Sequence, residues 1–342
     1  MNGRLLLRAA QVALLAAIAW GIYRVLAPEL GQLQWSDLVT MWRPAALPLA
    51  ASFVLLVTVY IMHALLWRRI MRDLAIGHLS IRATLHVYFV SSLGRYLPGK
   101  LWQLAGLAVL AKRAGLPPGA AAAAAVLGQF GFLTTGLLFL GLTLPDAAGE
   151  QAGPLALGAV LLITAGAVLW LLVATPIGHG FRTRVLRLAG ARAGEKLGAA
   201  FALADRVRPA SAAAWALGYA ISWVLLGLAF ALFVSAFEPA VIGRVRYLAG
   251  TVAAAYLAGY LFMLAPAGLG VREGAMLLLL QTLLPAGGAL VVSVLSRVWF
   301  TAAELAPLAL LPMFPAPVAP AAPVAPAAPE PPPADAESEE RR

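Results

Sequence analysis

The sequence predicts an all-α polytopic membrane protein with about six full transmembrane helices and two re-entrant hairpins of broken helices, arranged as an inverted repeat. Three observations carry this prediction: long apolar runs, two runs interrupted by proline and glycine, and a one-sided distribution of Lys and Arg. Of the 342 residues, 62% are apolar and 12% are charged. A soluble domain is about half apolar and a quarter charged. The predicted solvent of this chain is therefore a bilayer.

Full spans are predicted from runs of about 20 apolar residues. The six predicted spans are 9–26, 45–67, 120–144, 155–174, 212–237 and 289–311. The first run ends in Trp20, Tyr23 and Arg24, which are typical of a membrane interface. It is longer than the core of a signal peptide, which is about 7–15 residues. We therefore expect a retained helix, and a cleaved signal peptide is the alternative.

Two further apolar segments, 81–113 and 247–284, are interrupted near their middle. The helix breaks are assigned to Pro98, Gly99, Pro266, Gly268 and Gly270. Proline cannot donate a backbone N–H and glycine permits close backbone approach, so both residues favour a break. Neither half of either segment is long enough to cross a bilayer comfortably. Each segment is therefore predicted to enter the membrane and return to the same side.

Loops on one side of the predicted spans contain 15 Lys and Arg, and loops on the other side contain 4. The positive-inside rule therefore predicts a cytoplasmic N-terminus, and six spans return the C-terminus to the cytoplasm. Basic segment 179–209 is predicted either as an amphipathic helix on the inner leaflet or as an ordinary basic loop. In 313–342, proline recurs every third residue, which predicts a disordered cytoplasmic tail with polyproline II character.

The two broken segments align without a gap when the first is shifted by 168 residues. The matched pairs include Tyr88 with Tyr256, Pro98 with Pro266, Gly106 with Gly274, Pro117 with Pro285 and Phe132 with Phe300. The repeat units are 81–143 and 249–311, within a membrane domain over 1–312. Three spans separate the hairpins, so the second copy is inverted. Inverted repeats with broken helices are typical of secondary transporters. A repeat with no site between its copies is the alternative.

Charged residues cluster near the predicted breaks. A charge at the bilayer centre costs at least about 2.5–3.5 kcal/mol, so it needs a partner or a function. Arg95 and Lys100 flank the first break and Arg272 follows the second, beside the free N–H groups of a restarting helix. This pattern predicts a site for a lipid phosphate. The candidate headgroup residues are Arg95, Lys100, Gln103, Arg272, Glu273, Arg297 and Glu304.

Two acidic candidates, Glu273 and Glu304, are expected to pair with Arg297 or Arg272. The alternative is that these charges are internal salt bridges that fix helix packing. The composition excludes other kinds of site. No cysteine is present and the four histidines stand at unrelated spacings, so we expect no metal, no cofactor and no catalytic residue. We expect His63 and His86 to be packed, hydrogen-bonded side chains and not proton carriers.

Two motifs resemble those of a known family. The segment 94–103 (GRYLPGKLWQ), followed by 111–115 (AKRAG), resembles the first motif of the flippase-like lysylphosphatidylglycerol synthase transmembrane region. The segment 266–274 (PAGLGVREG), with Arg297 after it, resembles the second. The similarity covers about residues 5–312. It implies a bacterial inner-membrane protein that handles phospholipids or polyprenyl-phosphate-linked lipids.

In the best-known relatives this region flips aminoacylated phosphatidylglycerol made by an attached synthase domain. Here a Pro/Ala-rich tail follows residue 312, so aminoacyl transfer is not carried over. We expect a lipid translocase and not an enzyme. No phosphate-binding Gly-x4-Gly-Lys-Ser/Thr loop is present to bind ATP. The alternatives are an integral-membrane transferase acting on a lipid carrier and a scaffold for lipid-modifying enzymes. Membrane lipids with anionic phosphate headgroups are the expected partners, and +10 net charge indicates these before nucleic acid.

Overall fold

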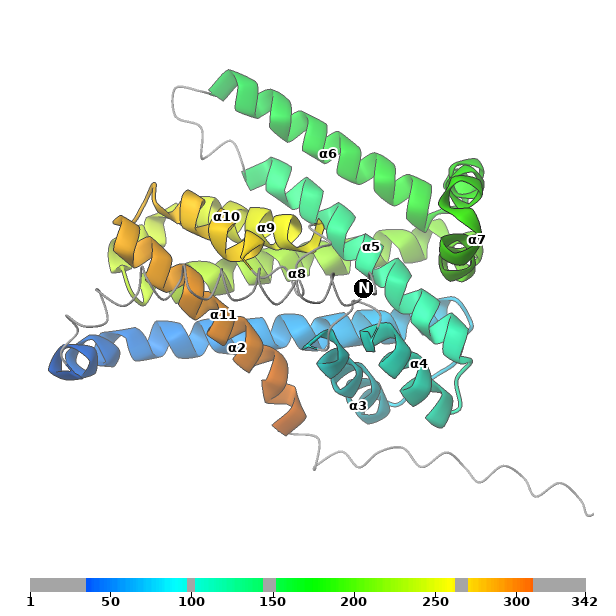
Figure 1. Cartoon of the computed structure of the whole chain (residues 1–342), viewed down its shortest axis with the longest axis horizontal. Helices are drawn as coiled ribbons and strands as arrows, with labels where there is room; N and C mark the ends of the chain where they lie inside the picture. Colours follow the sequence, from blue (N-terminus) through cyan, green and yellow to red (C-terminus); the bar gives the residue numbers. More distant parts are fainter. Residues whose placement is uncertain (1–34, 97–101, 144–151, 262–269, 310–342) are drawn as a thin grey trace, which may run out of the picture.

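The computed structural model describes residues 35–96, 102–143, 152–261 and 270–309, and every regular element in these ranges is a helix (Figure 1). The expected all-α class is therefore confirmed. The elements are α2 (Trp35–Asp73), α3 (Ile81–Ser92), η1 (Leu93–Tyr96), α4 (Trp102–Arg113), α5 (Pro118–Thr143), α6 (Ala152–Ala174), η4 (Pro176–Gly178), α7 (His179–Ala204), α8 (Pro209–Ser235), η5 (Pro239–Arg244), α9 (Val245–Leu261), α10 (Val271–Leu280) and α11 (Ala286–Ala309).

Four of the described helices are long and apolar enough to cross a membrane: α2 from Ala45 onward, α5, α8 and α11. A fifth candidate is a bent pair in which the second half of α6 meets the start of α7 at 85°. The structure thus supports four or five spans. The expected span 9–26 and the tail 313–342 lie outside the described residues.

The sequence marks several helix boundaries directly. Pro118 and Pro209 occupy the first turns of α5 and α8, where a missing N–H costs nothing. The hydroxyl of Ser80 accepts a hydrogen bond from the Ala83 N–H and so caps α3. After α4 the backbone turns at Gly115, whose φ of 80° suits glycine. These signals are local, which is why the sequence predicted the boundary regions well.

Close helix contacts hold the centre of the bundle together. Trp223 of α8 stacks on Phe132 of α5, with ring centroids 4.3 Å apart, and its Nε1 donates to the Phe132 carbonyl at 2.9 Å. Gly136, one turn further along α5, lies under the same indole, and a Cβ there would be 2.5 Å from its ring. Small residues that let helices approach this closely are typical of membrane bundles, where packing must replace the hydrophobic effect.

Two pairs of short helices each precede a long one. In the first, α3 with η1 packs against α4, and α5 follows; in the second, α9 packs against α10, and α11 follows. The two long helices begin at 118 and 286, which are 168 residues apart, the shift that aligns the two broken segments. The pairs also pack crosswise: α3 contacts α11, and α9 contacts α5.

Many of the exposed basic residues belong to elements that meet at one end of the bundle, the end where Figure 1 shows α7, at right. A core cluster there joins the C-terminal turns of α2 to α3, α4, the start of α5, α7 and the start of α8. The exposed basic residues around it are Arg69, Arg72, Arg82, Lys112, Arg113, Arg184, Arg187, Arg206 and Arg208. Arg244 and Arg246 lie near the opposite end, where Arg246 contacts the end of α5. The charge asymmetry expected from the sequence is thus present in space.

Candidate functional site

An ion pair joins the first pair of short helices to the last long helix. Arg95 lies in η1, and its Nη1 is 2.8 Å from Oε1 of Glu304 in α11. The Glu304 side chain is 6% exposed and that of Arg95 is 30% exposed. A buried carboxylate is costly unless a cation compensates its charge, and Arg95 provides that cation for Glu304. The pairing differs from the expected one, in which Glu304 pairs with Arg297 or Arg272.

A second arginine is held between aromatic rings. Arg272 lies in the first turn of α10, and its guanidinium carbon is 3.6 Å from the ring centroid of Phe300 and 5.4 Å from that of Tyr256. Both rings attract the cation through their negative faces. Its Nε and Nη2 atoms are buried and have no hydrogen-bond partner among the described residues. Buried guanidinium donors normally find an acceptor, so this group is equipped to bind one.

The carboxylate of Glu273 links the start of α10 to α11. Gly270, with a φ of 83°, precedes the helix, and its N–H donates to Oε2 of Glu273 at 2.7 Å. The other carboxylate oxygen, Oε1, lies 3.3 Å from Nη1 of Arg297. Both oxygens of Glu273 are therefore engaged. The pair positions Arg272, which lies between Gly270 and Glu273 in the chain, and it matches the expected pairing of Glu273 with Arg297.

Three tyrosines connect the two arginines. The Tyr60 hydroxyl of α2 lies within electrostatic range of Arg95, Glu304, Tyr256 and Arg272. Tyr88 of α3 lies within range of Arg95, Glu304 and Tyr256. Tyr256 of α9 lies within range of Arg95, Arg272 and Glu304. Both arginines thus lie near Tyr60 and Tyr256. Tyr60 was not predicted from the sequence. The available signal was a hydroxyl-bearing side chain inside an apolar run.

The interface of the hairpin halves has no room for a side chain at Gly94. A Cβ there would lie 2.6 Å from the backbone N of Gln103 and from the backbone C of Trp102. Gln103 is half-buried in the first turn of α4, and its backbone is the part that contacts Gly94. Of the other predicted site residues, Lys100, Pro98, Gly99, Pro266 and Gly268 lie outside the described residues.

The buried histidines differ from one another. His63 Nε2 lies 3.1 Å from the Ser222 hydroxyl, and its ring packs edge-on to Phe132 at 4.6 Å, as expected for a packed, hydrogen-bonded histidine. His86 has a buried Nδ1 without a hydrogen-bond partner among the described residues, so its hydrogen bonding stays a prediction. In the described part of the chain, no group of three His, Asp or Glu is placed to hold a metal ion.

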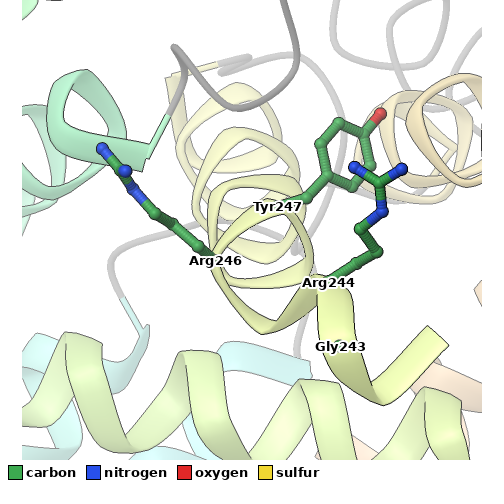
Figure 2. Close-up of a pocket in the computed structure, with 4 residues that line it drawn as sticks. All are labelled: Gly243, Arg244, Arg246 and Tyr247. Atoms are coloured by element: carbon green, nitrogen blue, oxygen red, sulfur yellow. The ribbon is translucent and has the colours of Figure 1, made fainter.

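A separate cavity of about 240 Å³ lies at the opposite end of the bundle from α7 and is lined by Gly243, Arg244, Arg246 and Tyr247. In Figure 2, Arg244 lies beside the Tyr247 ring while Arg246 points the other way. The Arg246 guanidinium donates to the Leu142 carbonyl and so caps the end of α5. This cavity is remote from Arg95 and Arg272 in the bundle, and the candidate site does not include it.

A comparison with protein families matches residues 8–303 to the lysylphosphatidylglycerol synthase transmembrane region. The chain belongs to this family. The match covers both pairs of short helices, all of α5 and most of α11. The family region therefore contains Arg95, Arg272, Glu273 and Arg297 and ends one residue before Glu304. No curated protein matches the chain, and no solved structure does. Family membership confirms the resemblance that the two motifs indicated, and it indicates a membrane protein of lipid metabolism or translocation.

Proposed function

We propose that the chain is a membrane lipid translocase that moves a phospholipid or a polyprenyl-phosphate-linked lipid between leaflets. The carrying observation is Arg272, whose buried Nε and Nη2 atoms have no acceptor among the described residues. The planar guanidinium fork matches the oxygens of a phosphate. Lipids of both classes carry a phosphate, and it needs donors wherever it leaves water. Family membership supports a lipid as the ligand.

Arg95 supplies the second cation of this proposed path. Its charge is balanced by Glu304 at 2.8 Å, and its side chain is still 30% exposed. The Nη1 atom of Arg95 contacts Glu304, and a guanidinium has further N–H donors that can bind an arriving phosphate while this ion pair is kept. The buried carboxylate of Glu304 therefore keeps its cation when the phosphate binds. The acyl chains remain in the lipid, and only the headgroup passes between the bundle elements.

The crosswise packing supports the inverted repeat. At a shift of 168 residues, α3 is equivalent to α9, and α5 to α11. An internal two-fold axis converts a contact between α3 and α11 into one between α9 and α5, and both contacts occur. We therefore treat α3–α4 and α9–α10 as re-entrant hairpins inserted from opposite sides, with the site between the copies.

The orientation follows from the charges. We propose that the basic end around α7 is cytoplasmic, in a bacterial inner membrane, and that both termini lie on that side. Single cysteines can be placed on a chain that has none of its own. A cysteine at Arg208 should react with an impermeant maleimide only in inside-out vesicles, and one at Arg244 only in right-side-out vesicles. The reverse pattern would contradict the orientation.

A leaflet assay in proteoliposomes tests the function. Headgroup-labelled phospholipid is quenched from outside, and the quenched fraction reports transfer. Arg272→Gln and Arg95→Gln should slow transfer about tenfold or more, because each removes a charge-assisted hydrogen bond of roughly 1.5–3 kcal/mol. The matched control is Arg244→Gln, which loses the same charge at an exposed position and should transfer lipid at the wild-type rate.

Three outcomes would contradict parts of the proposal. Wild-type transfer by both Arg272→Gln and Arg95→Gln, and by Lys100→Ala, would remove the cationic site from the path. Metal-dependent turnover of a nucleotide sugar by the pure protein would favour a lipid-carrier transferase. Loss of a protein complex with lipid movement intact, after deletion of 315–342, would favour a scaffold.

A further inference from the structure

A right-angle elbow joins α6 to α7. The axis of Pro176–Leu188 is bent by 85° from the axis of Val160–Val173. We take α6, which is apolar and 23 residues long, as the helix that crosses the bilayer, so that the segment at a right angle to it lies along the membrane surface. Figure 1 shows α7 at the end of the bundle, turned away from the direction of α6.

The elbow is fixed by a buried arginine. Arg182 is 2% exposed, and its Nη1 donates to the carbonyls of Leu172 at 2.8 Å and Thr175 at 2.5 Å. These bonds satisfy acceptors that a helix end leaves free. Gly178 lies so close to the Leu172 carbonyl that a Cβ would overlap it. The angle between the helices is therefore set by hydrogen bonds and close packing and does not depend on a flexible link.

Asp205 also holds Arg182 in this position. Asp205, at the far end of α7, accepts from Arg182 and lies 3.0 Å from His179 Nδ1. Partial burial raises the pKa of Asp205, but hydrogen bonds from His179 and Arg182 outweigh it and hold the pKa below its usual range. Since residues near both ends of α7 meet, the helix doubles back between them. The inner side of its first half, including Val185 and Leu186, packs against the core cluster at this end.

The opposite side of the same segment is exposed and combines apolar with basic side chains. Ile177 is 78% exposed, Phe181 40% and Leu188 83%. Phe181, Arg184 and Leu188 follow at intervals of three and four residues, so they share one helix face. Arg184 and Arg187 are also exposed. Exposed large apolar groups are unfavourable in water but favourable at a lipid boundary, where long basic side chains reach the phosphates.

We propose that this face of 176–188 binds anionic phospholipid headgroups on the membrane surface where α6 ends. The apolar side chains enter the boundary between headgroups and acyl chains, and Arg184 and Arg187 bind lipid phosphates. Charge complementarity selects the occupant, because residues 176–194 contain no Asp or Glu. An anionic surface attracts such a segment by about 1 kcal/mol per Lys or Arg. The proposal uses neither Arg95 nor Arg272, so it stands independently of the translocation site.

Spin labels on single cysteines test the proposal. The native chain has no cysteine, so Leu188→Cys gives one label on the face, and Arg206→Cys gives a matched exposed label in the loop before α8. Both proteins are placed in vesicles with and without phosphatidylglycerol in phosphatidylcholine. Accessibility to oxygen, which concentrates in lipid, is compared with accessibility to a water-soluble nickel chelate.

In vesicles with phosphatidylglycerol, the label at 188 should be severalfold more accessible to oxygen than to nickel, and the label at 206 should show the reverse. Arg184→Gln with Arg187→Gln should move the label at 188 toward water. Arg206→Gln with Arg208→Gln removes equal charge from the neighbouring loop and should not. The proposal would be overturned if the label at 188 were accessible to nickel. It would also be overturned if the label were shielded from both reagents, as under a second protein copy, or if it lay equally deep in vesicles of pure phosphatidylcholine.

Discussion

Breaking the ion pair between Arg95 and Glu304 should destabilise the bundle, and the two single substitutions should differ. Arg95→Gln leaves a carboxylate that is 6% exposed, whereas Glu304→Gln leaves a guanidinium that is 30% exposed. We therefore expect Arg95→Gln to lower the free energy of unfolding more than Glu304→Gln. The double substitution should recover part of the combined loss, because neither charge is then left without its partner.

The magnitude follows from the burial. Removing one partner of a fully buried pair costs about 3–5 kcal/mol, and an exposed pair contributes about 0–1 kcal/mol. Since Glu304 is buried and Arg95 is only partly so, we expect a coupling energy of roughly 1–3 kcal/mol between these limits. The comparison is the pair Arg69–Asp73 of α2, at 3.5 Å and spaced i,i+4, in which Arg69 is 47% and Asp73 16% exposed. Its coupling should be about 0.3–0.5 kcal/mol, and the double-mutant cycle separates this coupling from the hydrogen bond that Trp215 donates to Asp73.

The assay is reversible unfolding in mixed micelles, followed by tryptophan fluorescence for the wild type, both single variants and the double variant. A coupling energy equal to that of Arg69–Asp73 would refute the reasoning. It would mean that Arg95 and Glu304 do not form a buried pair in the folded protein. Equal losses for the two single variants would refute the argument from their unequal burial.

Three further tests address other parts of the structure. Gly136→Ala places a methyl group against the Trp223 indole and should cost about 1–3 kcal/mol by overpacking, measured by the same unfolding assay; an unchanged stability would mean that α5 and α8 are less close. Phe300→Leu removes the ring 3.6 Å from Arg272 and should slow lipid transfer about two- to tenfold, whereas Phe300→Tyr should retain it; equal rates for both would contradict the role of the ring. Because the folded-state pKa of Asp205 lies below its usual value of about 3.9, its contribution to stability is present above roughly pH 4 and is lost as the pH falls through the folded value. Hydrogen exchange at the elbow should therefore be unchanged between pH 8 and 5, after correction for intrinsic rates, and should rise below about pH 4; a rise near neutral pH would contradict this account.

Spans and their boundaries were predictable because local signals determine them. The apolar run 120–144 corresponds to α5, which begins at Pro118, and the run 155–174 corresponds to α6. A helix lying on the inner leaflet after α6 was one of the two predictions for 179–209, but the residue that fixes the bend was not predicted. That residue is Arg182, which in the sequence is one of many loop cations and which the structure buries against the end of α6.

The charged residues of the candidate site were easier to predict from the sequence than the ion pairs that they form. Charges beside breaks were identifiable because charge in an apolar run is costly. Which partner each charge takes depends on how distant helices cross, and Arg95 and Glu304 are separated by most of the chain. Tyr60 shows the same limit, because a tyrosine in an apolar run is common and only the assembled bundle places its hydroxyl near Arg272.

The carboxylate of the Arg95–Glu304 pair has no counterpart at the aligned position of the first repeat copy. The position equivalent to Glu304 is Gly136, which supports the indole of Trp223. Both long helices pack on α8 through aromatic rings, Phe132 against Trp223 and Trp299 against Phe233, but only α11 also has the carboxylate at this aligned position. Entering water weakens an ion pair, whereas a stacked contact separates only when the helices move apart. The second copy therefore has a contact that hydration can weaken, at a position where the first copy has a close-packed glycine.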